Sequence, residues 1–280
     1  MSASRDINYG LSYRTKTISV TSGKGGVGKS TIVSNLALEF EQRGKRVLIL
    51  DGDMGMANID IMFGVRPTHS IDSVLSGGKL LSEIMVDLSE DISLIPGGSG
   101  IYGLHTISSH QRKSLMDQVN GLKKRYDIML VDTASGIDDN VLYLNAASQE
   151  ILIILTPEPS SLADAYALIK VLNRKFSENK FSIVSNMVVS ESEGVQLYKR
   201  LSDVAQKFLN VSLDYKGSIP MDSDLRQATK TQQLVSRKQP RSTSSIAIRQ
   251  LSEKLSNYGD LMGIKGGLQF FWEQLVSEAS

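Results

Sequence analysis

The chain has 280 residues, and its 31 basic and 30 acidic residues leave a net charge of +1 at neutral pH. This balance excludes a strong global field that would attract nucleic acid or an anionic surface, so any such contact would need a local patch. There is no cysteine, which excludes disulfides, thiolate-bound iron–sulfur clusters and a thiol nucleophile.

The amino-terminal segment is polar, and residues 1–16 are interpreted as a mobile arm. It has no apolar signal region, and no run of about 18 apolar residues could span a membrane. We therefore expect a cytoplasmic protein. Residues 17–262 are predicted to form one domain, and residues 263–280 a separate tail.

Apolar strands and amphipathic helices alternate along the predicted domain. The expected strands are 17–22, 46–51, 91–96, 127–132, 150–157, 181–188 and 213–220. The expected helices are 30–44, 110–126, 160–176 and 194–209. Strands that are apolar throughout and alternate with helices imply a doubly wound α/β fold, with a mostly parallel sheet covered by helices on both faces. Loops that follow parallel strands meet at one sheet edge, where we expect a single site.

The first of these loops, 21-TSGKGGVGKST-31, lies between an expected strand and an expected helix. It matches G-x-x-x-x-G-K-[ST], the pattern of a phosphate-binding loop, which defines P-loop NTPases. Backbone N–H groups of such a loop surround phosphates, and the helix N-terminus adds a positive dipole. Lys29 is expected to bridge the β- and γ-phosphates, Ser30 to ligate Mg²⁺ and Thr31 to donate to the α-phosphate. The predicted nucleotide contacts in the loop are Gly23, Gly25, Gly26, Val27, Gly28, Lys29, Ser30 and Thr31.

Three aspartates follow apolar strands and are predicted to lie beside this loop. Asp132 ends the strand 127–132, where P-loop NTPases typically place an acid of the Mg²⁺ shell. Asp51 would lie deep in the site and, like Asp132, contact Mg²⁺ through water. Asp53 lies further along its loop and could orient the attacking water. As loop residues, Asp51 and Asp53 could instead serve as helix caps.

The loop also carries a second lysine, Lys24. The sequence KGGVGKST resembles the deviant Walker A motif of the MinD/ParA ATPases, a SIMIBI-like group. The resemblance runs from about residue 16 to residue 258 and includes DGDMGMANID, VDTASGI, SNM and IPMDSDLRQA. It implies ATP and Mg²⁺ as cofactors, hydrolysis of ATP to ADP and phosphate that is weak without a partner, and a homodimer in the ATP state.

The same resemblance implies that Lys24 reaches the partner's nucleotide across the dimer and that Asp53 is the hydrolytic aspartate. Phosphoryl transfer concentrates negative charge that a second cation would stabilise, as arginine fingers do. Lys29 already fills the position beside its own nucleotide. Lys24, Lys29 and Asp53 are therefore the predicted catalytic residues.

Further site residues come from the resemblance alone. It places Asp132 and Gly136 in switch II. It assigns adenine recognition to Asn186 and to the backbone around Pro220.

The tail contains a short apolar stripe in 266-GGLQFFWEQLV-276, which predicts an amphipathic helix. The stripe consists of Leu268, Phe271, Trp272, Leu275 and Val276, and Phe270 widens it. Trp and Phe suit a membrane interface, but Glu273 and Glu278 occupy the polar face, so attraction to anionic lipid would be weak. The alternative is docking on an apolar groove of the same domain. The two states could also alternate, docked without ATP and released in the ATP dimer.

The tail and residues 158–176 also resemble the flagellar-number regulators of the MinD-like group, the FlhG/FleN family. ADAYALIK followed by LNR, and the terminal GG-LQFFWEQL, carry this resemblance. It implies a switch that controls flagellum number and placement and cycles between a monomer and an ATP dimer at the inner face of the cytoplasmic membrane. Its expected partners are a flagellar GTPase, a flagellar transcription activator or a basal-body protein. The Gln- and Arg-containing motif that stimulates the GTPase in family members has no match in the arm, which leaves GTPase stimulation in doubt.

Three other functions stay open. A MinD-type division-site ATPase would share the core chemistry but should have a basic terminal helix. A ParA-type DNA-segregation ATPase would need a basic patch. Four isolated cations more often form a solvated face, so no direct nucleic-acid contact is expected. These candidate cations are Arg237, Lys238, Arg241 and Arg249. A metabolic ligase or transferase would need a second substrate pocket, and the sequence shows no obvious one.

Overall fold

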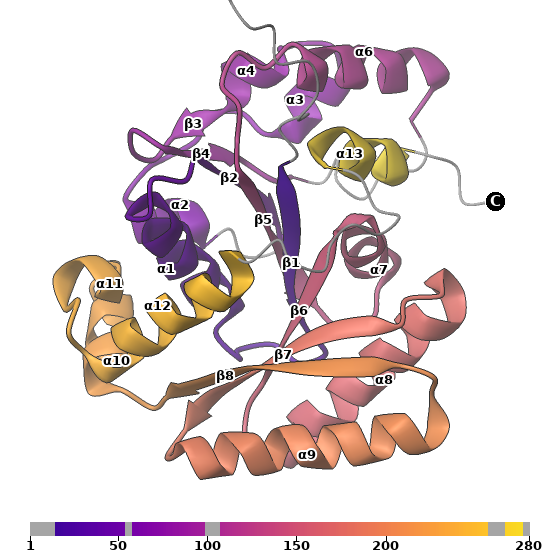
Figure 1. Cartoon of the computed structure of the whole chain (residues 1–280). Coiled ribbons are helices and arrows are strands. Elements are labelled where there is room, and N and C mark those ends of the chain that lie inside the picture. The colour runs from indigo at the N-terminus through magenta and orange to yellow at the C-terminus, as the bar shows by residue number, and fades with distance from the viewer. Residues whose placement is uncertain (1–14, 54–57, 99–106, 257–266, 277–280) are drawn as a thin grey trace, which may run out of the picture.

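The computed structural model describes residues 15–53, 58–98, 107–256 and 267–276 (Figure 1). One eight-stranded sheet has the order β3-β4-β2-β5-β1-β6-β7-β8. Adjacent strands are parallel except at the edge, where β3 runs antiparallel to β4. The predicted doubly wound α/β class is confirmed.

The bounds of the strands are β1 (Lys16–Ser22), β2 (Val47–Gly52), β3 (Val86–Asp87), β4 (Ile92–Ile95), β5 (Ile128–Ser135), β6 (Glu150–Leu155), β7 (Lys180–Val188) and β8 (Ser212–Pro220). The larger helices are α1 (Lys29–Glu41), α6 (Ser109–Asn120), α7 (Asp139–Ala147), α8 (Pro159–Phe176), α9 (Glu191–Phe208), α10 (Ser223–Lys230), α12 (Thr243–Ser256) and α13 (Leu268–Val276). The short helices are α2 (Ile59–Phe63), α3 (Ile71–Leu75), α4 (Leu81–Ile84) and α11 (Val235–Lys238).

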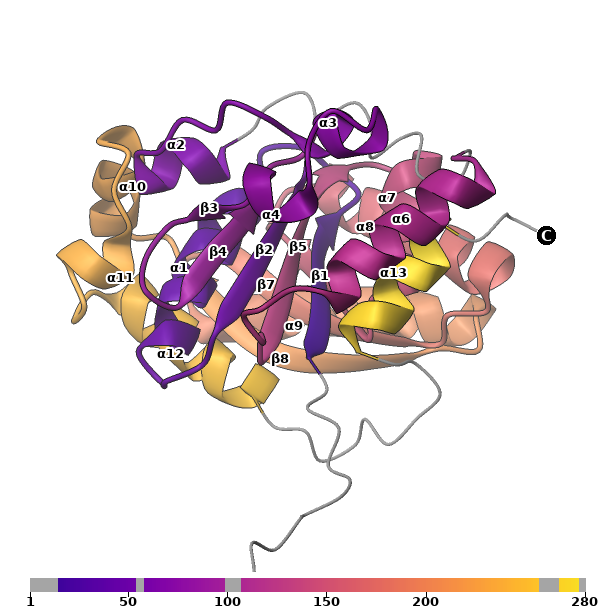
Figure 2. The ribbon, with the colours of Figure 1, turned by 90° about the horizontal axis from the view of Figure 1, so that it is seen from above.

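Helices cover both faces of the sheet because alternate strand residues point to opposite sides (Figures 1 and 2). On one face, Val47 and Ile49 of β2 belong to a core that includes residues of α1 and α12. On the other face, Leu48 and Leu50 of the same strand pack in a core with residues of α6, α7 and α13. A third cluster joins β6 and β7 to α8 and α9.

Several predicted boundaries differ from the structure, most of them by one to three residues. The helix expected over 110–126 ends at Asn120, where Gly121 forms the C-cap. Thr15 and Lys16, assigned to the arm, belong to the fold. Thr15 donates from Oγ1 to the carbonyl of Tyr126, and the buried Lys16 begins β1. The rest of the predicted arm lies outside the described residues.

The tail helix α13 packs against α6 and α7 instead of standing apart from the domain (Figure 1). Its apolar residues Phe271, Trp272, Leu275 and Val276 are buried in the core that lies on the α6 and α7 face of the sheet. Leu268 and Phe270, the other members of the predicted stripe, are half-buried. The structure therefore contains the docked arrangement of this helix.

Within the described ranges, no helix combines the length and the apolar character needed to cross a membrane.

Candidate functional site

The phosphate-binding loop joins β1 to α1 at the carboxyl edge of the sheet. Gly28 is the N-cap of α1 and has a left-handed φ of 93°, a conformation that favours glycine. A Cβ on Gly28 would also lie 2.7 Å from Nδ2 of Asn186. Lys29, the first residue of α1, is only 7% exposed. Burial lowers its pKa, and the nearby charges of Asp132 and Asp53 partly offset that effect.

A cavity of about 730 Å³ opens beside the loop and lies within the size range of small-molecule sites. The predicted residues that line it are Gly25, Gly26, Gly28, Lys29, Ser30, Thr31, Asp53, Asn186 and Pro220. Gly23, Lys24, Val27, Asp51 and Asp132 are not among its lining residues. The loops after β1, β2 and β8 and the carboxyl ends of β5 and β7 all contribute, as the parallel topology predicts.

Several lining residues were missed by sequence reasoning. Met221, Asp222, Leu225 and Arg226 follow β8, Met187 ends the neighbouring β7, and Ile248 comes from α12. The first four lie within IPMDSDLRQA, so that motif was the available signal. Ile248 has no local signal, because only the packing of α12 brings it to the cavity.

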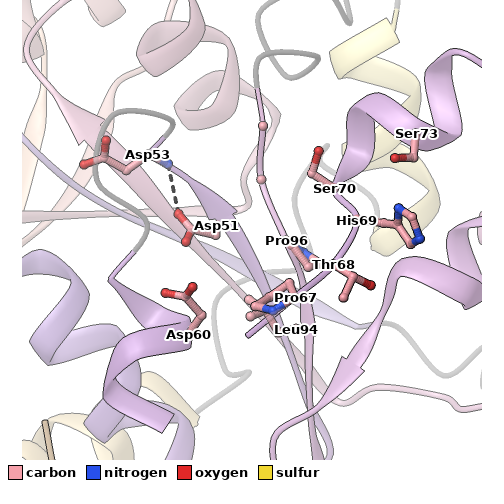
Figure 3. Close-up of a pocket in the computed structure, with 12 residues that line it drawn as sticks. Asp51, Asp53, Asp60, Pro67, Thr68, His69, Ser70, Ser73, Leu94 and Pro96 are labelled. Carbon is pink, nitrogen blue, oxygen red and sulfur yellow. Dashed lines mark hydrogen bonds between the residues drawn. The ribbon is translucent and has the colours of Figure 1, made fainter. Parts of the chain in front are cut away.

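Asp51 and Asp132 are brought together by the sheet register, which pairs them on the adjacent strands β2 and β5. Burial and the charge of Asp132 raise the pKa of Asp51 to about 8. Burial raises the pKa of Asp132 to about 7, although the nearby Ser30 hydroxyl and the positive charge of Lys29 lower it. Asp53 donates its backbone N–H to Oδ1 of Asp51 at 3.1 Å (Figure 3).

Asp132 is fully buried, and no hydrogen bond of 3.5 Å or less reaches either carboxylate oxygen, although Ser30 lies close enough to lower its pKa. A buried carboxylate in this state is costly unless a proton or a cation meets it. No group of three or more His, Cys, Asp or Glu residues within the described part of the chain could hold a metal by itself. A hard cation that kept several waters and phosphate oxygens, as Mg²⁺ does, would fit beside Asp132 and Ser30.

Asn186 lies at the end of β7 and is 3% exposed. Its Nδ2 donates to the carbonyl of Val27 at 2.8 Å, which joins β7 to the phosphate loop. Its Oδ1 is buried without a partner and can accept a hydrogen bond. Because Asn186 lines the cavity, that acceptor suits the exocyclic amine of a bound base.

Lys24 does not line the cavity. Its ammonium pairs with the carboxylate of Glu158 and donates to Oγ of Ser160 at 2.9 Å, both at the start of α8. The loop also packs closely on α8 at Gly23, where a Cβ would approach the backbone of Asp164 to 2.3 Å. The phosphate loop thus contacts α8 through both Gly23 and Lys24.

A smaller cavity of about 320 Å³ shares Asp53 with the larger one, and its lining residues are drawn in Figure 3. Asp51, Asp53 and Asp60 line one side of it, and His69 and Ser70 line the other. The sequence showed no second pocket, and this one is formed by segments that are distant in the chain. Because Asp53 borders both cavities, the smaller one adjoins the larger, and we assign it no separate ligand.

The four candidate cations do not act as one group. Arg249 donates from Nε to Glu39 at 3.1 Å and from a terminal nitrogen to the carbonyl of Pro240 at 3.1 Å. Arg237, Lys238 and Arg241 are exposed.

Comparison with known proteins identifies the class. The model of the ParA family, described as NUBPL iron-transfer P-loop NTPase, matches residues 14–256. The chain therefore belongs to the ParA family of P-loop ATPases. The given sequence contains no cysteine and therefore no thiolate ligand of the kind that holds iron–sulfur clusters.

The particular relatives are regulators of the MinD-like group. The chain is 36% identical to the antiactivator FleN of Pseudomonas aeruginosa, over 95% of each chain. It is 35% identical to the flagellum site-determining protein YlxH of Helicobacter pylori, over 94% of this chain and 90% of the relative. The structure of MinD from Pyrococcus horikoshii with Mg-ADP is also similar. It has a TM-score of 0.66 and 25% identity and covers 90% of this chain and 98% of that one.

Proposed function

We propose that the chain is a Mg²⁺-dependent ATPase that dimerises in the ATP state and controls the number or placement of flagella. The observation that carries the nucleotide chemistry is the buried carboxylate of Asp132, which lies near Ser30 and Lys29 but has no hydrogen bond of 3.5 Å or less. Bound MgATP would supply the cation that this carboxylate lacks. The flagellar role is supported by the similarity to FleN and YlxH over nearly the whole chain.

Each residue of the site has a distinct role in this proposal. The backbone of the phosphate loop and Lys29 hold the phosphates, and Ser30 and Asp132 hold the Mg²⁺ shell. Asn186 accepts from the adenine amine. Mg²⁺, when bound, neutralises charge on the β- and γ-phosphates. Asp53, which borders the cavity, orients the attacking water.

In the proposed dimer, Lys24 leaves Glu158 and contacts the nucleotide of the partner. Its place on the outer side of the loop supports this role, because the cation already points away from its own cavity. A monomer would then lack one cation at each site and hydrolyse ATP slowly. The conformational state of the dimer, rather than ADP, would be the output.

The tail helix adds a second proposed switch element. Docked α13 hides the aromatic residues Phe271 and Trp272, and release would expose them to a membrane. Its exposed face carries Glu273 and no basic residue within Leu268–Val276, so we propose that apolar contact, not charge, would drive membrane association. Sedimentation with liposomes, with and without residues 264–280 and in ATP or ADP, tests this. Equal sedimentation in all four conditions would contradict the proposed nucleotide-dependent release of α13.

The test of the proposed cellular role is an affinity pull-down with an Asp53→Ala variant loaded with ATP. We expect a flagellar GTPase, a flagellar transcription activator or a basal-body protein to be recovered. The ADP-loaded protein is the control and should recover less. Recovery of division-site proteins alone would favour a MinD-type division function, for which the solved Aquifex aeolicus MinC:MinD complex is a structural relative.

A further inference from the structure

The carboxylate of Asp222, which lines the large cavity, joins the loop after β8 to α10 and α12. Oδ1 accepts from the backbone N–H of Asp224, in the first turn of α10, at 2.8 Å. Oδ2 accepts from the backbone N–H of Ser244 at 2.9 Å and from Oγ1 of Thr243 at 3.1 Å, both in the first turn of α12. One side chain thus caps the N-termini of two helices.

These bonds hold the side chain as a carboxylate. Burial would raise the pKa of Asp222, but the hydrogen bonds from Ser244 and Asp224 outweigh it and keep the pKa at about 2. A negative charge at a helix N-terminus is also favoured by the helix dipole. Both the negative charge of Asp222 and its hydrogen bonds therefore stabilise the junction.

The joined segments form one wall of the cavity. Its residues from the β8–α10 segment and from α12 are Pro220, Met221, Asp222, Leu225 and Ile248. The backbone N–H of Met221 donates to the carbonyl of Val188 at 2.8 Å, which ties the same loop to the end of β7, beside Asn186. The wall is thus held on one side by a strand and on the other by Asp222.

The helix α12 does not need Asp222 in order to form. Ser242 precedes α12, and its Oγ accepts from the backbone N–H of Ser245 at 3.2 Å, which caps the helix locally. Asp222 adds hydrogen bonds between the β8–α10 loop and α12 to the apolar packing of β8 and α10 against α12. Their loss would loosen this junction, and none of these bonds involves the phosphate loop.

We propose that Asp222 is a positioning residue that sets the width of the base-binding end of the cavity, so that it determines affinity for the base but not for the phosphates. The inference rests on the proposed binding of ATP at this site. In this proposal Asp222 acts by holding Pro220 and Met221 of the loop near α12, through its bonds to Thr243 and Ser244.

The experiment is calorimetric titration of the full chain with MgATP and, separately, with magnesium tripolyphosphate, which has no base. Asp222→Asn should weaken ATP binding roughly tenfold, since it removes the charge and part of the acceptor set. Thr243→Val, which removes one of the three donors, should weaken it about twofold to threefold. The matched control, Asp224→Asn, removes the same charge two residues away and should leave ATP affinity within about twofold.

Tripolyphosphate affinity separates positioning from a general structural effect. We expect it to stay within about twofold in every variant, because the phosphate loop is untouched. Unchanged ATP binding in Asp222→Asn would overturn the inference, and so would an equal loss for ATP and tripolyphosphate. Circular dichroism checks the fold. If Asp222→Asn is unfolded, Thr243→Val decides by the same criterion. A wild-type chain that binds neither ligand would overturn the proposed function itself.

Discussion

Lys24 and Glu158 form an ion pair within one chain, between the phosphate loop and the start of α8. A second hydrogen bond from Lys24 to Ser160 holds the ammonium in place. For Lys24 to act on a partner's nucleotide, it must first leave these two groups. The pair lies near the surface, with side chains 33% and 60% exposed, so it is expected to be weak.

Glu158→Gln should strengthen ATP-dependent dimerisation, because it removes the carboxylate that competes for Lys24. An exposed pair contributes about 0–1 kcal/mol and two pairs break in each dimer, so the dimer dissociation constant should fall by no more than about thirtyfold. Sedimentation equilibrium in MgATP measures it. Glu90→Gln removes the same charge from an exposed turn as a control. A dimer no tighter than that of the control would show that the pair does not restrain Lys24.

Lys24→Ala should keep ATP affinity within about twofold, since Lys24 does not line its own cavity. It should lose the ATP dimer, and partner-stimulated turnover should fall by about 10² to 10³. Titration of nucleotide binding, sedimentation and phosphate release measure the three quantities. Lys113→Ala, an exposed lysine on α6, is the control. Normal dimerisation and hydrolysis in Lys24→Ala would refute its action across the dimer.

Asp53→Ala should bind ATP and accumulate as a dimer, because the loss of the residue that orients water slows hydrolysis more than binding. The expected turnover rate is lower than that of the wild type by a factor of about 10² to 10⁴. Size-exclusion chromatography after incubation with MgATP should show a persistent dimer that decays quickly in the wild type. Fast turnover by Asp53→Ala would reassign the hydrolytic role.

Apo-protein stability should decrease as pH rises from about 5 to 8. The pKa values of Asp51 and Asp132 are raised in the folded state, to about 8 and about 7, from 3.8. Between the ordinary pKa of 3.8 and these raised values, the folded chain holds protons that the unfolded chain has released. The free energy of unfolding therefore falls as pH rises, by up to about 1.4 kcal/mol per pH unit for each group. Because the two groups interact, they titrate as a pair.

Urea unfolding across this pH range measures the slope. Asp132→Asn should flatten it and stabilise the apo-protein at pH 8, since the amide needs no proton. MgATP should also reduce the slope in the wild type, because the cation replaces the proton. A slope that is the same in the wild type and in Asp132→Asn would contradict the placement of Asp132 as a buried, raised carboxyl.

Trp272→Ala should destabilise the domain by roughly 3–5 kcal/mol, because the indole is fully buried in the core shared with α6 and α7. Glu273→Ala, the adjacent exposed residue of α13, should change stability by less than about 0.5 kcal/mol. Urea unfolding in ADP compares the two. Equal, small effects would mean that α13 is not docked in solution.

Sequence patterns were sufficient to place most of the predicted site residues at one sheet edge. Gly28, Lys29 and Ser30 are adjacent in the chain, so one local motif predicts their geometry. Asp51 and Asp132 each end an apolar strand, and parallel pairing must bring two such ends to one edge. Residues that depend on a strand or a loop can be placed in this way, because the backbone itself positions them.

The remainder depends on contacts between segments that have no periodic relation. The partner of Lys24 lies 134 positions away at Glu158, and nothing in either stretch specifies the other. The wall joined by Asp222 needs α12, which the strand–helix pattern did not predict. The stripe of α13 was visible, but an apolar stripe is equally compatible with a membrane and with a groove.

The sequence by itself determined the α/β class, the phosphate loop and the acids beside it, because backbone geometry and strand order follow from short local patterns. Only the tertiary structure decided that Lys24 is held by Glu158, that Asp222 links the loop after β8 to α12, and that α13 fills a groove against α6 and α7. These outcomes depend on complementary shape and charge between distant surfaces, which no local pattern encodes.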